Sequence, residues 1–123
     1  MLASMDRYAP HFITHVVFAQ KSLVAKNPDL VERFLKGFFA AIAFMKTHRE
    51  ETSVLAGRVL QQSPAVVRKD YDFEVDMFND DGRFDPQAVA ALKQSFVDMK
   101  TLPGQPADDV LFTTQFVPVQ PQP

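Results

Sequence analysis

The amino-acid sequence predicts a helix-rich α/β fold with one or two strands and about four helices. A run of β-branched and aromatic residues near the start predicts the strand segment. Three helix-start signals predict helices, each a capping residue followed by proline: Asn27-Pro28, Ser63-Pro64 and Asp85-Pro86. The chain has 123 residues, of which 46% are hydrophobic and 23% are charged. This composition is typical of a folded protein that forms one domain or part of one.

The strand is expected at residues 11–19, whose sequence is HFITHVVFA. Its last four residues are continuously apolar, which indicates burial on both faces of a sheet. A helical segment is expected at residues 28–69. It opens with the sequence Asn-Pro-Asp at 27–29, where Asn can cap free backbone N–H groups and Pro suits the first helical position.

The first helix of this segment is expected to extend from Pro28 to about Lys46. Leu30, Phe34 and Phe38 recur at four-residue spacing, and further apolar residues widen this stripe. We therefore expect a broad aromatic face packed in the core.

Three further segments follow the helical region. Residues 70–78 begin with a strict polar–apolar alternation over eight residues, which predicts an extended segment or an edge strand. A helix is expected at residues 86–102, after an Asp85 cap, and residues 119–123 are expected to form a disordered tail.

The composition excludes several classes of function. The chain has no cysteine, which excludes disulfides, a thiol nucleophile and cysteine-ligated metal centres. A net charge of −2 argues against a nucleic-acid-binding protein. The longest mainly apolar stretch, residues 34–45, is shorter than the ~20 residues that a membrane-spanning helix needs. Met1–Pro10 has neither a basic nor an apolar region, so we expect no export signal in this chain.

Charge is distributed unevenly along the chain. Residues 1–69 carry 10 Lys/Arg and 5 Asp/Glu, giving +5, whereas residues 70–123 carry 3 and 10, giving −7. Seven of these acids lie between Asp70 and Asp85. This run is either a solvated acidic face or a surface for a cation or a basic partner.

The sequence contains no recognisable catalytic constellation, so we expect neither enzymatic activity nor a cofactor. Asn79, Asp81 and Gly82 partly match a calcium-binding loop, but the first and last ligand positions lack acids, which favours a plain turn. His11 and His15 fall on one face of the predicted strand, where they are either structural or ligand-contacting side chains. No further metal ligand lies near them in the sequence, so no metal site is expected.

The stretch HVVFAQKSLVAKNPDLVERFLKGFFAAIAFMKTH (residues 15–48) resembles the C-terminal part of periplasmic solute-binding proteins of the nitrate/sulfonate/taurine type. Relatives that bind thiamine pyrimidine precursors share the pattern. The first phrase of the resemblance consists of Asn27, Pro28, Asp29, Val31, Phe34 and Leu35. The second consists of Phe78, Asp81, Gly82, Arg83, Phe84 and Asp85, followed by Pro106 and Asp108. In order and spacing, the resemblance spans about residues 8–118.

The resemblance implies that residues 1–118 are a partial lobe, the C-terminal part of a type 2 periplasmic-binding-protein-like fold. Residues 11–19 would be the strand that returns from the second lobe to the first. Tyr8, His11 and Thr14 would contact the ligand, and other ligand contacts would come from polypeptide outside this chain. The implied function is to bind a small organic anion or heterocycle, such as nitrate, a sulfonate, taurine or a pyrimidine precursor, and deliver it to an ABC permease. The implied location is the periplasm.

Two alternatives remain open at this point. The first alternative is a free-standing helical interaction module, cytoplasmic and oligomeric, that binds its partner through a face containing Phe34, Phe38 and Phe39. An enzyme resembling the pyrimidine-precursor synthases of the same fold has the least support. The high phenylalanine content and a strand without sheet partners predict a homo-oligomer, because unpaired strand edges and exposed apolar faces tend to associate. The competing expectation is a compact monomer whose helices fold back over the strand.

Overall fold

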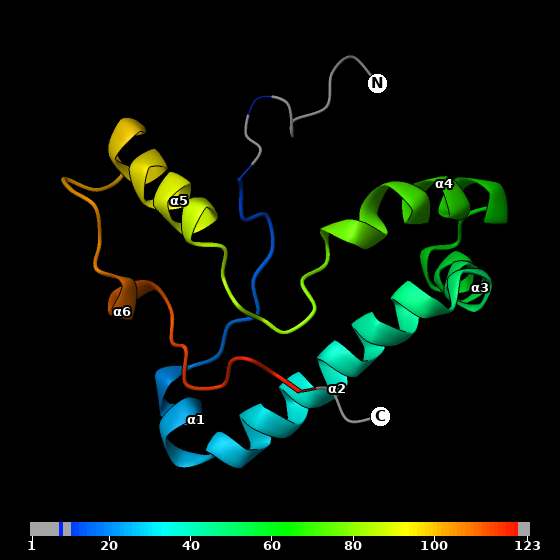
Figure 1. The fold of residues 1–123 in the computed structure, drawn as a ribbon, viewed down its shortest axis with the longest axis horizontal. Coiled ribbons are helices and arrows are strands. Elements are labelled where there is room, and N and C mark those ends of the chain that lie inside the picture. The colour runs from blue at the N-terminus through cyan, green and yellow to red at the C-terminus, as the bar shows by residue number, and fades with distance from the viewer. Residues whose placement is uncertain (1–7, 9–10, 121–123) are drawn as a thin grey trace. The chain divides into compact units, whose positions relative to one another are not determined.

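The structure, a computed structural model, describes residue 8 and residues 11–120 (Figure 1). Helical residues make up 62% of the described chain. The helices are α1 (Lys21–Lys26), α2 (Pro28–Thr47), α3 (Arg49–Leu60), α4 (Pro64–Glu74), the 3-10 helix η2 (Val75–Met77), α5 (Pro86–Asp98) and α6 (Asp108–Leu111). The chain forms two compact units. The first comprises residues up to Lys21 together with Arg83–Gln115, and the second comprises Ser22–Gly82 together with the chain from Phe116 onward.

The predicted α/β class is wrong, because the described residues contain helices but no strand. The expected strand at residues 11–19 is coil. A strand exists only where a second strand accepts and donates its ladder hydrogen bonds. No backbone hydrogen bond joins residues 12–19 to any other described residue, so their β-branched composition alone produces no strand.

The core of the second unit forms against one side of α2. Phe39 and Ile42 of α2 are each 6% exposed and pack with Val119. The expected broad aromatic face is therefore divided. Phe34, which is 57% exposed, and Phe38, which is 39% exposed, lie outside the core.

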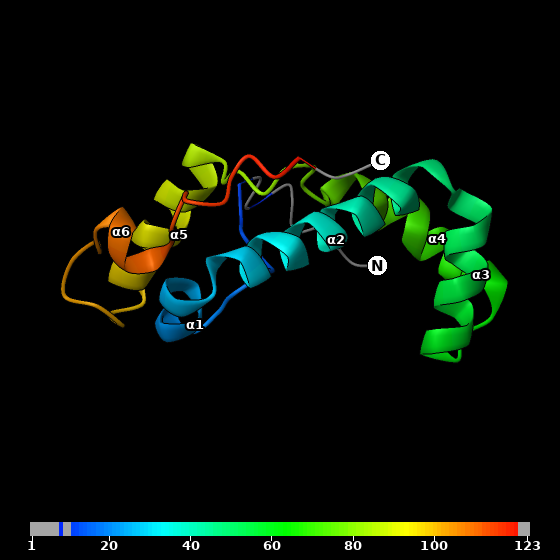
Figure 2. The same cartoon turned by 90° about the horizontal axis from the view of Figure 1, so that it is seen from below.

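Helices α3 and α4 lie side by side in the second unit, as both views show (Figures 1 and 2). Ser53 of α3 and Val67 of α4 are buried. Arg49 joins the two helices through two hydrogen bonds of 2.7 Å to the carboxylate of Asp72. The Tyr71 hydroxyl donates a 2.6 Å hydrogen bond to the backbone carbonyl of Met45, which ties α4 to the end of α2.

The extended segment expected at residues 70–78 is also wrong, because α4 continues through Glu74 and η2 follows directly. The apolar residues that alternate in this stretch include Tyr71 and Val75, which are four apart and continue the helical spacing from Val67. These three residues are the partly or fully buried ones, whereas Phe73 and Met77 are 50% and 64% exposed. Burial of Val67, Tyr71 and Val75 on one helical face therefore favours a helix over an extended segment.

In the first unit, α5 presents buried Ala88 and Val89. The helix expected at residues 86–102 ends at Asp98. Lys100 has a φ of 57°, which breaks the helical path, and the backbone N–H of Thr101 donates to the carbonyl of Phe96. A residue in the left-handed region followed by such a hydrogen bond is a common helix ending.

The tail expected at residues 119–123 is ordered at its beginning. Val119 is 6% exposed, and its backbone N–H donates a 2.8 Å hydrogen bond to the carbonyl of Asp81. Residues 121–123 lie outside the described part of the chain.

Candidate functional site

The ligand-contact residues expected from the sequence all lie in the first unit and are exposed. Tyr8 is 77% exposed. Thr14 Oγ1 lies 3.0 Å from His15 Nδ1, and His11 Nδ1 lies 2.9 Å from Asp85 Oδ2. Among the described residues, no hydrogen bond or ring contact joins any two of Tyr8, His11 and Thr14.

The contact between His11 and Asp85 fixes the start of the coil segment to the beginning of α5. Asp85 is the N-cap of α5, and its Oδ1 accepts a 2.9 Å hydrogen bond from the backbone N–H of Gln87. That N–H lowers the pKa of Asp85 below its usual value, and the hydrogen bond from His11 lowers it further. The cap was predictable from the Asp-Pro signal, but its second partner is 74 residues away in sequence and was not.

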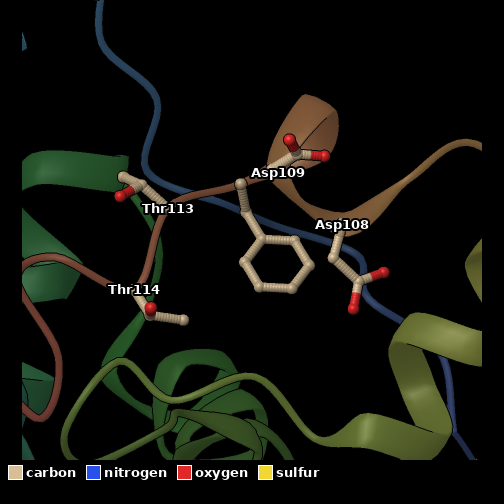
Figure 3. A pocket seen from close by; sticks show the side chains of 5 residues that line it. Asp108, Asp109, Thr113 and Thr114 are labelled. Atoms are coloured by element: carbon tan, nitrogen blue, oxygen red, sulfur yellow. The ribbon is translucent and has the colours of Figure 1, made fainter.

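The first unit also has a shallow hollow of about 380 Å³, lined by Asp108, Asp109, Phe112, Thr113 and Thr114 (Figure 3). The Phe112 ring packs against Phe84, with 4.7 Å between ring centroids. Lys93 Nζ donates a 2.7 Å hydrogen bond to Asp108. Carboxylates and hydroxyls around an aromatic ring can accept hydrogen bonds from an amine, but they provide no activated nucleophile.

No binding site was predicted at this hollow from the sequence. Asp108 appeared only as the end of the second phrase of the resemblance. Tyr8, His11 and Thr14 are not among the residues that line the hollow. The signals available in the sequence were two adjacent acids and two adjacent threonines around a phenylalanine, which are too common to indicate a site.

A charged cluster in the second unit is structural. Arg49 binds Asp72 and Glu50, and Arg68 Nη2 lies 2.9 Å from Glu50 Oε2. The Arg49 guanidinium lowers the pKa of Asp72, and Arg68 lowers that of Glu50. Each charge in this cluster has an opposite charge beside it, so the cluster presents no unbalanced charge to a ligand.

Part of the acidic run between Asp70 and Asp85 has partners within the chain. Asp72 binds Arg49, Asp80 lies 2.6 Å from Lys46 Nζ, and Asp85 binds His11. These acids hold helices and turns together. The described residues contain no group of three or more His, Cys, Asp or Glu side chains that could hold a metal ion.

No helix among the described residues has the length and apolar character needed to cross a membrane. Comparison of the chain with protein-family models, curated proteins and solved structures finds no match.

Proposed function

We propose that this chain is part of the solute-binding component of an ABC importer, and that it acts by binding rather than by catalysis. Its solute would be a small organic anion or heterocycle, such as nitrate, a sulfonate, taurine or a pyrimidine precursor. The bound solute would be delivered to a membrane permease from the periplasmic side. This proposal rests on the two sequence phrases that resemble such proteins, and on the structural role that the second phrase has here.

The observation that supports the proposal most strongly is the geometry of the phrase between residues 78 and 85. Gly82 has a φ of 81°, and a Cβ added there would lie 3.1 Å from Phe39 Cζ and from Val117 Cγ1. The backbone carbonyl of Asp81 accepts a hydrogen bond from the backbone N–H of Val119, which a residue of any type could do. The close packing around Gly82 is therefore the feature of the phrase that requires a particular residue, and it supports the proposal at that position.

The first phrase also coincides with a structural boundary. Asn27 is the N-cap of α2 and Pro28 occupies its first turn, as the resemblance implies. No side-chain hydrogen bond from Asn27 caps the helix. The asparagine therefore contributes through its backbone conformation, and its carbonyl accepts a 3.1 Å hydrogen bond from Leu30 N–H.

Tyr8, His11 and Thr14 would supply the ligand contacts of this chain. A phenol, an imidazole and a hydroxyl can each donate a hydrogen bond to an anionic oxygen or a ring nitrogen. All three are exposed in the described structure, so the rest of the binding cleft would come from other polypeptide. Closure of that polypeptide over the solute would complete the site.

Titration calorimetry on the protein encoded by the complete open reading frame that contains this sequence tests the proposal. The titrants are nitrate, taurine, an alkanesulfonate and an aminopyrimidine. We expect one of them to bind with micromolar affinity, and we expect His11→Ala or Thr14→Ala to weaken that binding. His48→Ala, which alters a histidine stacked on Phe44 in the second unit, is the matched control and should leave the affinity unchanged. Failure of all four titrants to bind would contradict the proposal.

The second candidate function is a helical interaction module, and the exposed side of α2 favours it. Phe34 and Phe38 lie with 6.1 Å between their ring centroids and are exposed, whereas Phe39 is buried and unavailable to a partner. Such a module would be cytoplasmic and oligomeric. It predicts that Phe34→Ser abolishes oligomers and that none of the four solutes binds.

A further inference from the structure

The backbone of the coil segment at residues 12–19 is unpaired within the part of the chain that the structure describes. No backbone N–H or C=O of these residues forms a hydrogen bond with another described residue. Apolar side chains in the segment are also exposed: Phe12 and Val16 at 55%, Val17 at 46% and Phe18 at 90%. Backbone that is unpaired and carries β-branched and aromatic side chains is a template for pairing with another strand.

The sequence of this segment is nearly symmetric about His15. Moving outward, Thr14 and Val16 are both β-branched, Ile13 and Val17 are both β-branched and apolar, and Phe12 and Phe18 are identical. In an antiparallel pair of identical segments, a two-fold axis at the central residue places each residue opposite its symmetric counterpart. The pattern therefore suits a second copy of the same segment.

We propose that two copies of this chain associate through antiparallel β-pairing of residues 12–18, with His15 of each copy opposite His15 of the other. Phe12 then lies opposite Phe18 of the second copy, and this pair occurs twice in the dimer. Aromatic and β-branched residues directly opposite each other are favourable cross-strand pairs. The chain alone has no strand here, because the ladder forms only between copies.

The exposed apolar area sets an upper bound on the size of the interface. At roughly 200 Å² for a whole phenylalanine side chain, the exposures of Phe12 and Phe18 offer about 600 Å² in a symmetric pair. The exposed parts of Val16 and Val17 and the paired backbone raise this bound to near the ~1,000 Å² of a small specific interface. The ladder includes Thr14, which the proposed function assigns to the solute, so the two proposals share a segment. Crosslinking and sedimentation measure the dimer and calorimetry measures solute binding, so the failure of one proposal is distinguished from the failure of the other.

Disulfide trapping tests the register, and the absence of cysteine from the natural chain makes it unambiguous. In the proposed register, the Cα atoms at position 15 are about 4.5–5.5 Å apart, within the range that a disulfide bridges. We expect His15→Cys to form a covalent dimer under mild oxidation. Phe12→Cys is the matched control, because the two copies of position 12 lie at opposite ends of the ladder and should not form a disulfide. Equal crosslinking of both variants, or none with His15→Cys, would overturn the register.

Sedimentation velocity tests the pairing itself. The double variant Val16→Pro/Val17→Pro removes a ladder donor whichever of these residues bonds across the pair, and should weaken association by at least about tenfold. Neither N–H is hydrogen-bonded to other described residues, so the fold should persist, which circular dichroism checks. Phe18→Ser should weaken the dimer. Phe34→Ser is the matched control, because it makes the same replacement at an exposed phenylalanine of the second unit, and it should leave the dimer intact. A wild-type mass of 13.9 kDa at high micromolar concentration, or loss of the dimer only with Phe34→Ser, would overturn the proposal.

Discussion

The close approach at Gly82 makes a quantitative prediction for the second unit. A Cβ at this position would lie 3.1 Å from both Phe39 Cζ and Val117 Cγ1, and 3.2 Å from Phe39 Cε2. Its φ of 81° also lies in the region that costs a residue with a side chain about 1–2 kcal/mol. Phe39 is 6% exposed and belongs to the core, so it can give way only by disturbing its neighbours. We expect Gly82→Ala to destabilise the protein by about 2–3 kcal/mol.

Gly37 provides the matched control, because it is the same residue type in the interior of α2. A Cβ added at Gly37 would meet no atom within 4 Å. Alanine favours the helix over glycine by about 0.8–1.0 kcal/mol, so Gly37→Ala should stabilise the protein by up to about that amount. Thermal and urea unfolding followed by circular dichroism at 222 nm measure both variants, and each kcal/mol shifts the thermal midpoint by roughly 4 °C in a chain of this length. Equal effects, or a destabilising Gly37→Ala, would refute the packing argument.

Three further predictions follow from buried and paired side chains. Ser53→Ala should stabilise the protein by about 1 kcal/mol in urea unfolding, because the buried Ser53 hydroxyl has no hydrogen-bond partner among the described residues and its desolvation is uncompensated; a loss of stability would mean that the hydroxyl has a partner. Phe39→Ala should cost about 3–5 kcal/mol in the same assay, whereas Phe34→Ala should cost less than about 1 kcal/mol, and similar values would mean that the sides of α2 are misassigned. Arg49 lowers the pKa of Asp72, so the stabilising effect of this pair is present above the pKa of Asp72 in the unfolded chain and is lost as the pH falls through its folded value. Asp72→Asn should therefore be less stable than wild type at pH 7, and the difference should shrink as the pH falls below the ordinary pKa of an aspartate.

The local signals for helix starts were the most reliable part of the sequence analysis. Asn27-Pro28, Ser63-Pro64 and Asp85-Pro86 each mark the beginning of a helix in the structure. These signals work because proline restricts its own backbone to helical φ values regardless of tertiary context. Only Asp85 among the three caps its helix through a side-chain hydrogen bond. The sequence therefore predicted where these helices begin, but not whether the capping side chain forms a hydrogen bond.

The errors in the sequence analysis arose where tertiary contacts decide the structure. The alternation after Asp70 indicates a strand when viewed alone, but Tyr71 and Val75 pack on the same helical face as Val67. The segment at residues 11–19 has the composition of a strand, but no backbone hydrogen bond joins residues 12–19 to other described residues. Composition favours a strand without supplying the second strand that the ladder needs.

The candidate site was predictable only in part, for a similar reason. His11 was identified as a possible ligand-contacting residue, but its contact with Asp85 joins residues 74 positions apart. No local periodicity encodes such a contact. The hollow beside Phe112 likewise depends on how α6 and the following coil fold back on themselves. Short motifs in the sequence identified candidate residues, whereas the residues that these candidates contact in space became known only from the structure.

Solute uptake in cells tests the central claim most directly. The gene that contains this sequence would be deleted from its source organism, and uptake of radiolabelled nitrate, taurine, an alkanesulfonate and an aminopyrimidine would be measured at micromolar concentrations. We predict that the deletion abolishes high-affinity uptake of one of these solutes. The intact gene should restore that uptake, and a copy with both His11→Ala and Thr14→Ala should restore it poorly. Unchanged uptake of all four solutes would contradict a role in solute import.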